Sequence, residues 1–157
     1  MDESQITLRR AEPADAPAIV ALTRAAYAKW VPLLGREPKP MAADYAVAVR
    51  DHLVDLLFVA AKLAALIEMI PQPDHLLIEN LAVSPEFQGR GYGRRLVAYA
   101  EQVAASRGIG TIRLYTNKLF AENLRFYDRL GYAVVEEEDF KGGVIVHMSK
   151  KLPAFPG

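Results

Sequence analysis

A glycine-rich segment between a strand pattern and a helix pattern constrains the fold of this 157-residue chain most strongly. Apolar residues from 75 to 83 predict a strand, which Pro85 ends. Residues 91–107 carry apolar side chains at helical spacing until Gly108. The segment between these two patterns, residues 88–95, reads QGRGYGRR. A strand, a glycine turn and a helix in this order indicate an α/β fold.

The other patterns extend this unit into one predicted domain, residues 1–157. Strands are predicted near residues 6–8, as two antiparallel stretches within 52–70, and at 75–83, 111–116, 132–138 and 144–150. Helices are predicted at 13–30, 41–50, 91–107 and 121–130, with a proline-rich loop at 31–40. No glycine, asparagine or proline marks the hairpin turn near Lys62. We expect a mixed, mostly antiparallel twisted sheet of about seven strands flanked by about four helices.

Composition excludes several classes of function. The formal net charge is zero, which argues against electrostatic capture of nucleic acid. The chain has no cysteine, so disulfides, thiolate zinc sites and a cysteine nucleophile are excluded. None of its three histidines stands at a helical ligand spacing, and we therefore expect no metal.

No membrane partner is expected either. The first ten residues, MDESQITLRR, contain no apolar signal region. The most apolar stretch, residues 56–70, is interrupted by Lys62 and Glu68. These features predict a cytoplasmic protein.

The glycine segment is suited to an anion. Glycine allows positive φ angles, and the free N–H groups of a helix start face outward. Three arginines, Arg90, Arg94 and Arg95, lie at the predicted helix N-terminus, where positive charge interacts unfavourably with the helix dipole. A bound polyanion such as a pyrophosphate would turn this repulsion into attraction. Arg94 stands where a P-loop needs lysine and where a dinucleotide fingerprint needs a small residue, so both motifs fail. The alternative is a glycine-rich turn with solvated arginines.

The chain resembles the GNAT (general control-related N-acetyltransferase) superfamily. Residues 88–93, QGRGYG, match the Q/R-x-x-G-x-G/A signature of its pyrophosphate-binding loop. Residues 81–85, LAVSP, are similar to the strand-end "xVxP" pattern, and residues 127–132 to the later "Y-x-x-x-G-F/Y" pattern. The first third of the chain matches only the order of elements.

The resemblance implies acetyl-CoA as co-substrate and no metal. Asparagine side chains are expected on the pantetheine amides, although the commoner asparagine position of the family corresponds to Phe120 here. The residues expected to bind the coenzyme are Leu81, Ala82, Val83, Gln88, Gly89, Arg90, Gly91, Tyr92, Gly93, Arg94, Asn117 and Asn123.

Two residues are candidates for proton transfer. Glu79 interrupts an apolar strand and is the expected base, with Glu68 as the second choice. The alternative role of Glu79 is purely structural, as a carboxylate bound to a neighbouring side chain. Tyr127, in the later family pattern, is expected to protonate the departing thiolate, unless it is only a packed side chain.

We therefore expect an N-acetyltransferase whose acceptor is an amine of an unidentified small molecule or peptide, attacking the thioester directly. Tyr27, Trp30 and Tyr45 are the expected substrate residues, and His147 is a further possibility; aromatic core packing is their alternative role. A longer acyl-CoA donor, a non-catalytic acyl-CoA sensor and an interaction domain without coenzyme remain open, and a homodimer is possible.

Overall fold

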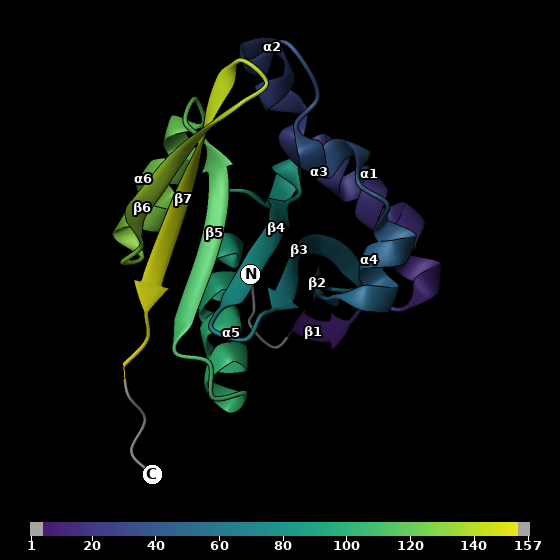
Figure 1. Ribbon diagram of the computed structural model, residues 1–157. Coiled ribbons are helices and arrows are strands. Elements are labelled where there is room, and N and C mark those ends of the chain that lie inside the picture. Colours follow the sequence, from purple (N-terminus) through teal and green to yellow (C-terminus); the bar gives the residue numbers. More distant parts are fainter. Residues whose placement is uncertain (1–4, 154–157) are drawn as a thin grey trace. The chain divides into compact units, whose positions relative to one another are not determined.

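The computed structural model describes residues 5–153 and forms a seven-stranded sheet of order β1-β2-β3-β4-β5-β7-β6 (Figure 1). β4 and β5 pair in parallel, whereas β1–β2, β2–β3, β5–β7 and β6–β7 are antiparallel. The predicted mixed, mostly antiparallel sheet is confirmed. The strands are β1 (Ile6–Arg10), β2 (Leu53–Val59), β3 (Lys62–Pro71), β4 (Leu76–Val83), β5 (Thr111–Asn117), β6 (Ala133–Phe140) and β7 (Gly143–Lys151). The helices are α1 (Ala16–Tyr27), α2 (Val31–Leu34), α3 (Lys39–Ala42), α4 (Tyr45–Asp51), α5 (Tyr92–Ser106) and α6 (Ala121–Arg129).

The chain divides into two compact units. The first comprises the described residues up to Met69 together with Asn80–Val97. The second comprises Ile70–Glu79 and the described residues from Ala98 onward. A single domain over residues 1–157 therefore stays a prediction.

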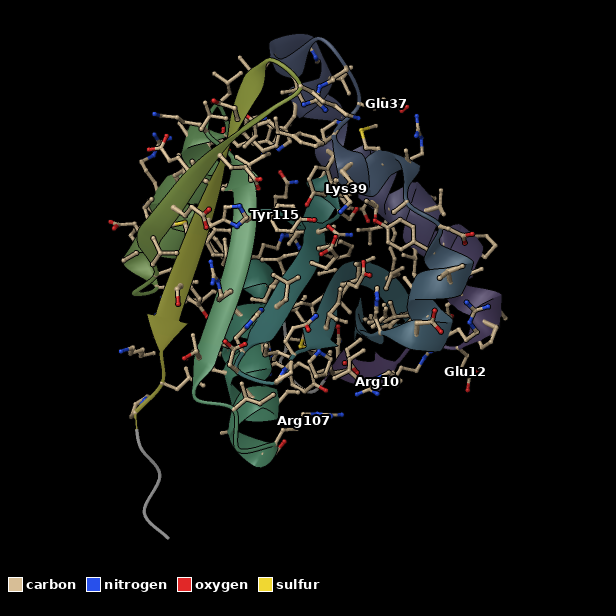
Figure 2. All side chains as sticks on the ribbon, viewed as in Figure 1. Arg10, Glu12, Glu37, Lys39, Arg107 and Tyr115 are labelled. Atoms are coloured by element: carbon tan, nitrogen blue, oxygen red, sulfur yellow. The ribbon has the colours of Figure 1, made fainter. Side chains whose placement is uncertain are left out.

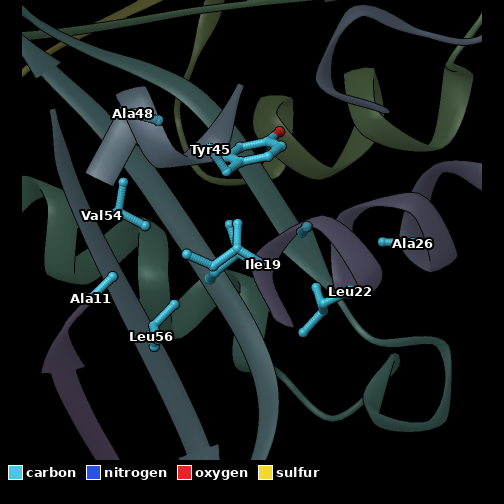
Figure 3. Close-up of a cluster of buried hydrophobic side chains, with 10 residues drawn as sticks. Ala11, Ile19, Leu22, Ala26, Tyr45, Ala48, Val54 and Leu56 are labelled. Atoms are coloured by element: carbon cyan, nitrogen blue, oxygen red, sulfur yellow. The ribbon is translucent and has the colours of Figure 1, made fainter. Parts of the chain in front are cut away.

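The core of the first unit lies between α1, α4 and the strands β2 and β3. Ile19, Leu22 and Ala26 recur at helical spacing on α1 and are buried. Val54 and Leu56, which alternate along β2, belong to the same cluster (Figure 3). Each fully buried aliphatic side chain of this kind contributes about 1.5–3 kcal/mol.

The helical segment before β2 differs from the prediction. The expected helix over 41–50 is two helices, α3 and α4, because Asp44 caps α4 by accepting hydrogen bonds from the N–H groups of Ala46 and Val47. The expected loop at 31–40 contains the short helix α2, which ends at Gly35 with φ +77°.

The hairpin between β2 and β3 is confirmed, but its turn uses unusual residues. Val59 pairs with Lys62, so Ala60 and Ala61 form the turn. Both have positive φ angles, 49° and 70°. Tight hairpin turns require such angles and usually contain glycine or asparagine. Because alanines occupy both positions here, the sequence carries no turn signal.

In the second unit, β4, β5, β7 and β6 carry helices on one face. Ile112 and Leu114 of β5 are buried on that face, as are Val146 and Met148 of β7. The side chain of Glu101 on α5 accepts hydrogen bonds from Tyr132 and Lys150, which ties the helix to the loop after α6 and to β7.

Candidate functional site

A buried aromatic pair anchors the glycine loop in the first unit. Phe87 and Tyr92 flank the loop in sequence, and their rings meet edge to face at a centroid distance of 6.1 Å. The side-chain amide of Gln88 donates to the carbonyl of Val83 at 3.1 Å and so joins the loop to the end of β4. Residues 88–91 between these anchors are exposed.

Two of the three glycines in the segment 88–95 are required by backbone conformation. Gly89 has φ +78° and Gly91 has φ +85°, and a Cβ atom added at either would meet nothing within 4 Å. Space is therefore open around both, whereas an L-residue there would be strained.

The loop leads into the N-terminus of α5, which offers free donors. The Arg95 N–H donates to the carbonyl of Gly91 at 3.0 Å. The N–H groups of Tyr92, Gly93 and Arg94 come before this first helical bond and have no helical acceptor. A helix start of this kind is suited to an anion.

Positive charge surrounds this helix start. The first turn of α5 contains no acidic residue. The Arg90 guanidinium lies 5.5 Å from the centroid of the Phe87 ring, and both Arg90 and Arg94 are exposed. Within residues 5–153, Arg94 forms no ion pair. The loop thus combines oriented N–H donors with guanidinium groups, which fits a pyrophosphate.

Strand β4 presents alternate side chains to two faces, as its sequence predicts. Glu79, Leu81 and Val83 are half-buried, whereas Asn80 and Ala82 are buried. The side chain of Ala82 belongs to the core cluster of the first unit, so only its backbone remains for a ligand.

Glu79 has a well-defined partner within the second unit. The Tyr115 hydroxyl on β5 donates to Oε1 of Glu79 at 2.6 Å. Figure 2 labels Tyr115 beside strand β5. Glu79 was predicted from the sequence, whereas Tyr115 was not, although the alternation of residues 111–116 places this tyrosine on the face opposite Leu114.

Glu68, the second-choice base, lies in the first unit and is engaged with a histidine. Its side chain is nearly buried, and Oε2 is 2.6 Å from Nδ1 of His52. A buried carboxylate of this kind is stabilised by its partner, so the contact gives Glu68 a structural role.

Tyr127 on α6 is buried between two rings. Its ring lies 5.0 Å from that of Phe126 and 5.9 Å from that of Tyr132. Its hydroxyl donates to no group in the described part of the chain. Burial raises the pKa of Tyr127 above its ordinary value of 10.0, which keeps the phenol protonated at neutral pH.

The two candidate asparagines make local hydrogen bonds. Oδ1 of Asn117 accepts from the N–H of Leu119 at 2.9 Å and orders the turn before α6. Nδ2 of Asn123 lies 3.4 Å from the Thr116 hydroxyl.

Of the expected substrate residues, Tyr45 has a packing role. It is 2% exposed and belongs to the core cluster, while its hydroxyl donates to the carbonyl of Pro40 at 2.7 Å.

Tyr27 is half-buried and donates to Oδ1 of Asn80 at 2.9 Å. Trp30 is largely buried, with the Lys29 ammonium 4.9 Å from its ring. Asn80 was not predicted as a functional or structural polar residue, although a polar side chain on the buried face of an apolar strand is a sequence signal for such a role.

Residues 5–153 contain no group of three or more histidine or acidic side chains that could hold a metal ion. Within the same residues, no helix combines the length and the apolar character needed to cross a membrane.

Comparison with known proteins gives one consistent family. The model of the acetyltransferase (GNAT) family matches residues 20–132. N-alpha-acetyltransferase 80 of Mus musculus is 35% identical over 104 residues, which cover 66% of this chain but only 27% of that protein. Streptothricin acetyltransferase of Streptomyces lavendulae is 36% identical over 58 residues, covering 37% of this chain and 31% of that protein. The matches thus span about a third or less of these curated relatives.

Solved structures share the fold. The ribosomal-protein-S18-alanine N-acetyltransferase from Escherichia coli has a TM-score of 0.78 at 21% identity, covering 96% of both chains. The paia N-acetyltransferase from Thermoplasma acidophilum, solved in complex with coenzyme A, has a TM-score of 0.74 at 22% identity, covering 93% of this chain and 98% of that chain. The match of the family model, which spans well over half of the chain and includes the glycine loop, shows that the chain belongs to the acetyltransferase (GNAT) family.

Proposed function

We propose that this chain transfers an acetyl group from acetyl-CoA to an amine of a small molecule or peptide. The glycine loop carries the proposal: two glycines with positive φ lead into a helix start with free N–H groups and exposed arginines. Two further facts support it, the family match and the coenzyme A bound to the T. acidophilum relative.

In this proposal the loop binds the pyrophosphate of the coenzyme. The N–H groups of Tyr92, Gly93 and Arg94 donate to its oxygens, and the side chains of Arg90 and Arg94 neutralise its charge. Gln88 and Gly89 shape the turn, while Gly91, which has no side chain, leaves space for the pyrophosphate to approach the backbone.

The pantetheine arm would bond to backbone groups of β4. Leu81 and Val83 lie on the half-buried face of that strand, and Ala82 contributes only backbone groups. Asn117 and Asn123 are proposed to bond the pantetheine amides, for which their present local hydrogen bonds would have to be shared.

Glu79 is the proposed base. An alkylamine with a pKa of about 10.4 is mostly protonated at neutral pH and must lose a proton before it attacks the thioester. Glu79 accepts this proton directly or through a water molecule, and the amine nitrogen then forms a bond to the acyl carbon. Glu68 is the weaker candidate because His52 engages its carboxylate.

Tyr127 is the proposed acid. The bond between the acyl carbon and the sulfur breaks as the amide forms, and the sulfur takes a proton from the phenol. A thiol has a pKa of about 8.5. Proton transfer from a phenol to a thiolate therefore becomes less favourable as the pKa of the phenol rises. Burial raises the pKa of Tyr127, which keeps the proton on the phenol until the sulfur departs.

The proposed acceptor side includes Tyr27, which caps the start of the 3-10 turn after α1, and Trp30, the last residue of that turn. We propose a cytoplasmic enzyme with an amine acceptor and no nucleic-acid or membrane partner, and a homodimer is compatible with it. The names of the relatives include both an N-alpha-acetyltransferase and an antibiotic acetyltransferase, so both acceptor classes belong in the test.

The test is release of free thiol from acetyl-CoA in the presence of an amine panel. The panel contains peptides with a free N-terminus, the same peptides with a blocked N-terminus and an internal lysine, and small polyamines. Amine-dependent thiol release with formation of the acetylated product supports the proposal. Release only with succinyl-CoA would assign a longer acyl donor, and binding of acetyl-CoA without release for any amine would favour a sensor.

A further inference from the structure

Four titratable side chains form a row across one sheet face of the second unit. Tyr115 of β5 and His147 of β7 are register partners, so their side chains lie on the same face. Their rings are tilted at 45° with a centroid distance of 6.1 Å. Glu79 of β4 bonds to Tyr115 on one side, and Glu138 of β6 lies 2.7 Å from Nε2 of His147 on the other.

The bond between Tyr115 and Glu79 has the length of a charge-assisted hydrogen bond. Its oxygen–oxygen distance is 2.6 Å, within the range of about 2.5–2.7 Å for a hydroxyl that donates to an anionic oxygen. Such a donor fixes the orientation of the two carboxylate oxygens. Tyr115 is only half-buried, yet its ring is held between neighbouring strands.

His147 supports the tyrosine from the other side. Its Nε2 contact with Glu138 fixes the plane of the imidazole ring against which Tyr115 packs. Other charged side chains on this face are Arg113, beside Leu77 of β4, Glu136, the register partner of His147, and Lys151, the register partner of Thr111. Tyr115 is thus a direct hydrogen-bond partner of Glu79 on a face that carries charges of both signs.

We propose that Tyr115 is a positioning residue that holds the Glu79 carboxyl group in the orientation of a proton acceptor. The importance of this for catalysis rests on the proposed function, in which Glu79 is the base. The hydrogen bond itself is independent of that function and can be tested without it.

The first test follows the resonance of the Glu79 carboxyl carbon by NMR at pH 7 in protein labelled at glutamate, with Glu79→Gln as the assignment variant. In Tyr115→Phe this resonance should move, because the carboxyl group loses its donor and its fixed orientation. Tyr132→Phe is the matched control, since it removes a tyrosine hydrogen bond from a different glutamate, Glu101, and should leave the Glu79 resonance in place. An unchanged Glu79 resonance in Tyr115→Phe would overturn the inference.

The second test measures thiol release in wild type and both variants at saturating acetyl-CoA. In Tyr115→Phe kcat should fall by about tenfold, while the affinity for acetyl-CoA stays unchanged. Tyr132→Phe should release thiol like wild type. A moved Glu79 resonance with an unchanged kcat would remove Glu79 as the base and with it the catalytic role of Tyr115, whereas the structural bond would stand.

Discussion

The Tyr27 hydroxyl of α1 and the side-chain oxygen of Asn80 on β4 form a hydrogen bond of 2.9 Å across a sequence separation of 53 residues. Asn80 is 3% exposed, and its amide nitrogen lies 3.1 Å from the Tyr45 hydroxyl and 3.4 Å from that of Thr23. Tyr45 in turn donates to the carbonyl of Pro40. One buried amide thus connects β4 with α1 and α4 within the first unit.

Replacement of Asn80 by alanine should therefore destabilise the protein by about 3 kcal/mol, because several buried hydroxyl groups lose a partner and a small cavity opens. Urea unfolding measures the change. Tyr27→Phe, which removes one of these hydrogen bonds and keeps the ring, should cost about 1 kcal/mol. Equal losses in the two variants would show that Asn80 does not organise the network.

Much of the fold was predictable because its signals are local. The alternation of residues 111–116, the helical spacing of 91–107 and the stops at Pro85 and Gly108 each mark an element that the structure contains. The break between α3 and α4 also has a local cause, the cap that Asp44 forms on α4. The sequence signal of this cap is weaker than the apolar pattern over residues 41–50, so one continuous helix was predicted.

The candidate site was predictable only in part. The glycine loop has a sequence signature since its function depends on backbone conformation at Gly89 and Gly91. The partners of Glu79 and Glu68 have no such signature. Tyr115 reaches Glu79 through strand register, and His52, between α4 and β2, reaches Glu68 through tertiary packing; no short stretch of sequence encodes either contact. The burial of Tyr45 likewise depends on tertiary packing.

The alanine turn between β2 and β3 should gain stability from glycine. Ala61 has φ +70°, a conformation that costs an L-residue about 1–2 kcal/mol, and glycine avoids this cost at some loss of chain entropy. We expect Ala61→Gly to stabilise the protein by about 0.5–1 kcal/mol in urea unfolding. The control is Ala43→Gly, at an exposed alanine with φ −71°, which should instead destabilise it. Destabilisation by both variants would contradict the strained turn.

Asp15 should stabilise the protein at neutral pH and lose this effect in acid. Hydrogen bonding to the Arg9 guanidinium holds the pKa of Asp15 below its ordinary value of 3.8. A carboxyl with a lowered folded-state pKa contributes fully above 3.8, and the contribution is lost as the pH falls from there through the folded-state pKa. The stability difference between wild type and Asp15→Asn, measured by thermal unfolding from pH 7 downward, should therefore shrink below about pH 4.

The same comparison in an Arg9→Gln background supplies the control for Asp15. Without the guanidinium, the difference should be smaller and less dependent on pH. A difference that is the same at every pH in the wild-type background would mean that the ion pair does not act on Asp15.

Tyr127→Phe should lower kcat by roughly 100-fold, the lower end of the effect of a general acid, with no change in acetyl-CoA affinity. Phenylalanine keeps the ring contacts with Phe126 and Tyr132, so the packing is retained. Single-turnover thiol release measures the chemical step. The variant Tyr132→Phe, at the neighbouring ring, should change kcat by less than about threefold. A similar kcat for Tyr127→Phe and wild type would remove Tyr127 as the acid.

The central claim, that the glycine loop binds the pyrophosphate of acetyl-CoA, is tested most directly by isothermal titration. Wild type should bind acetyl-CoA with a Kd on the order of micromolar and should show no binding of NAD. Gly91→Ala should weaken acetyl-CoA by about tenfold because φ +85° strains an L-residue in the loop. Gly108→Ala, with φ +69° outside the loop, and Gly110→Ala, with an ordinary φ, should bind like wild type. Absence of acetyl-CoA binding by wild type, or equal affinities of wild type and Gly91→Ala, would contradict the claim.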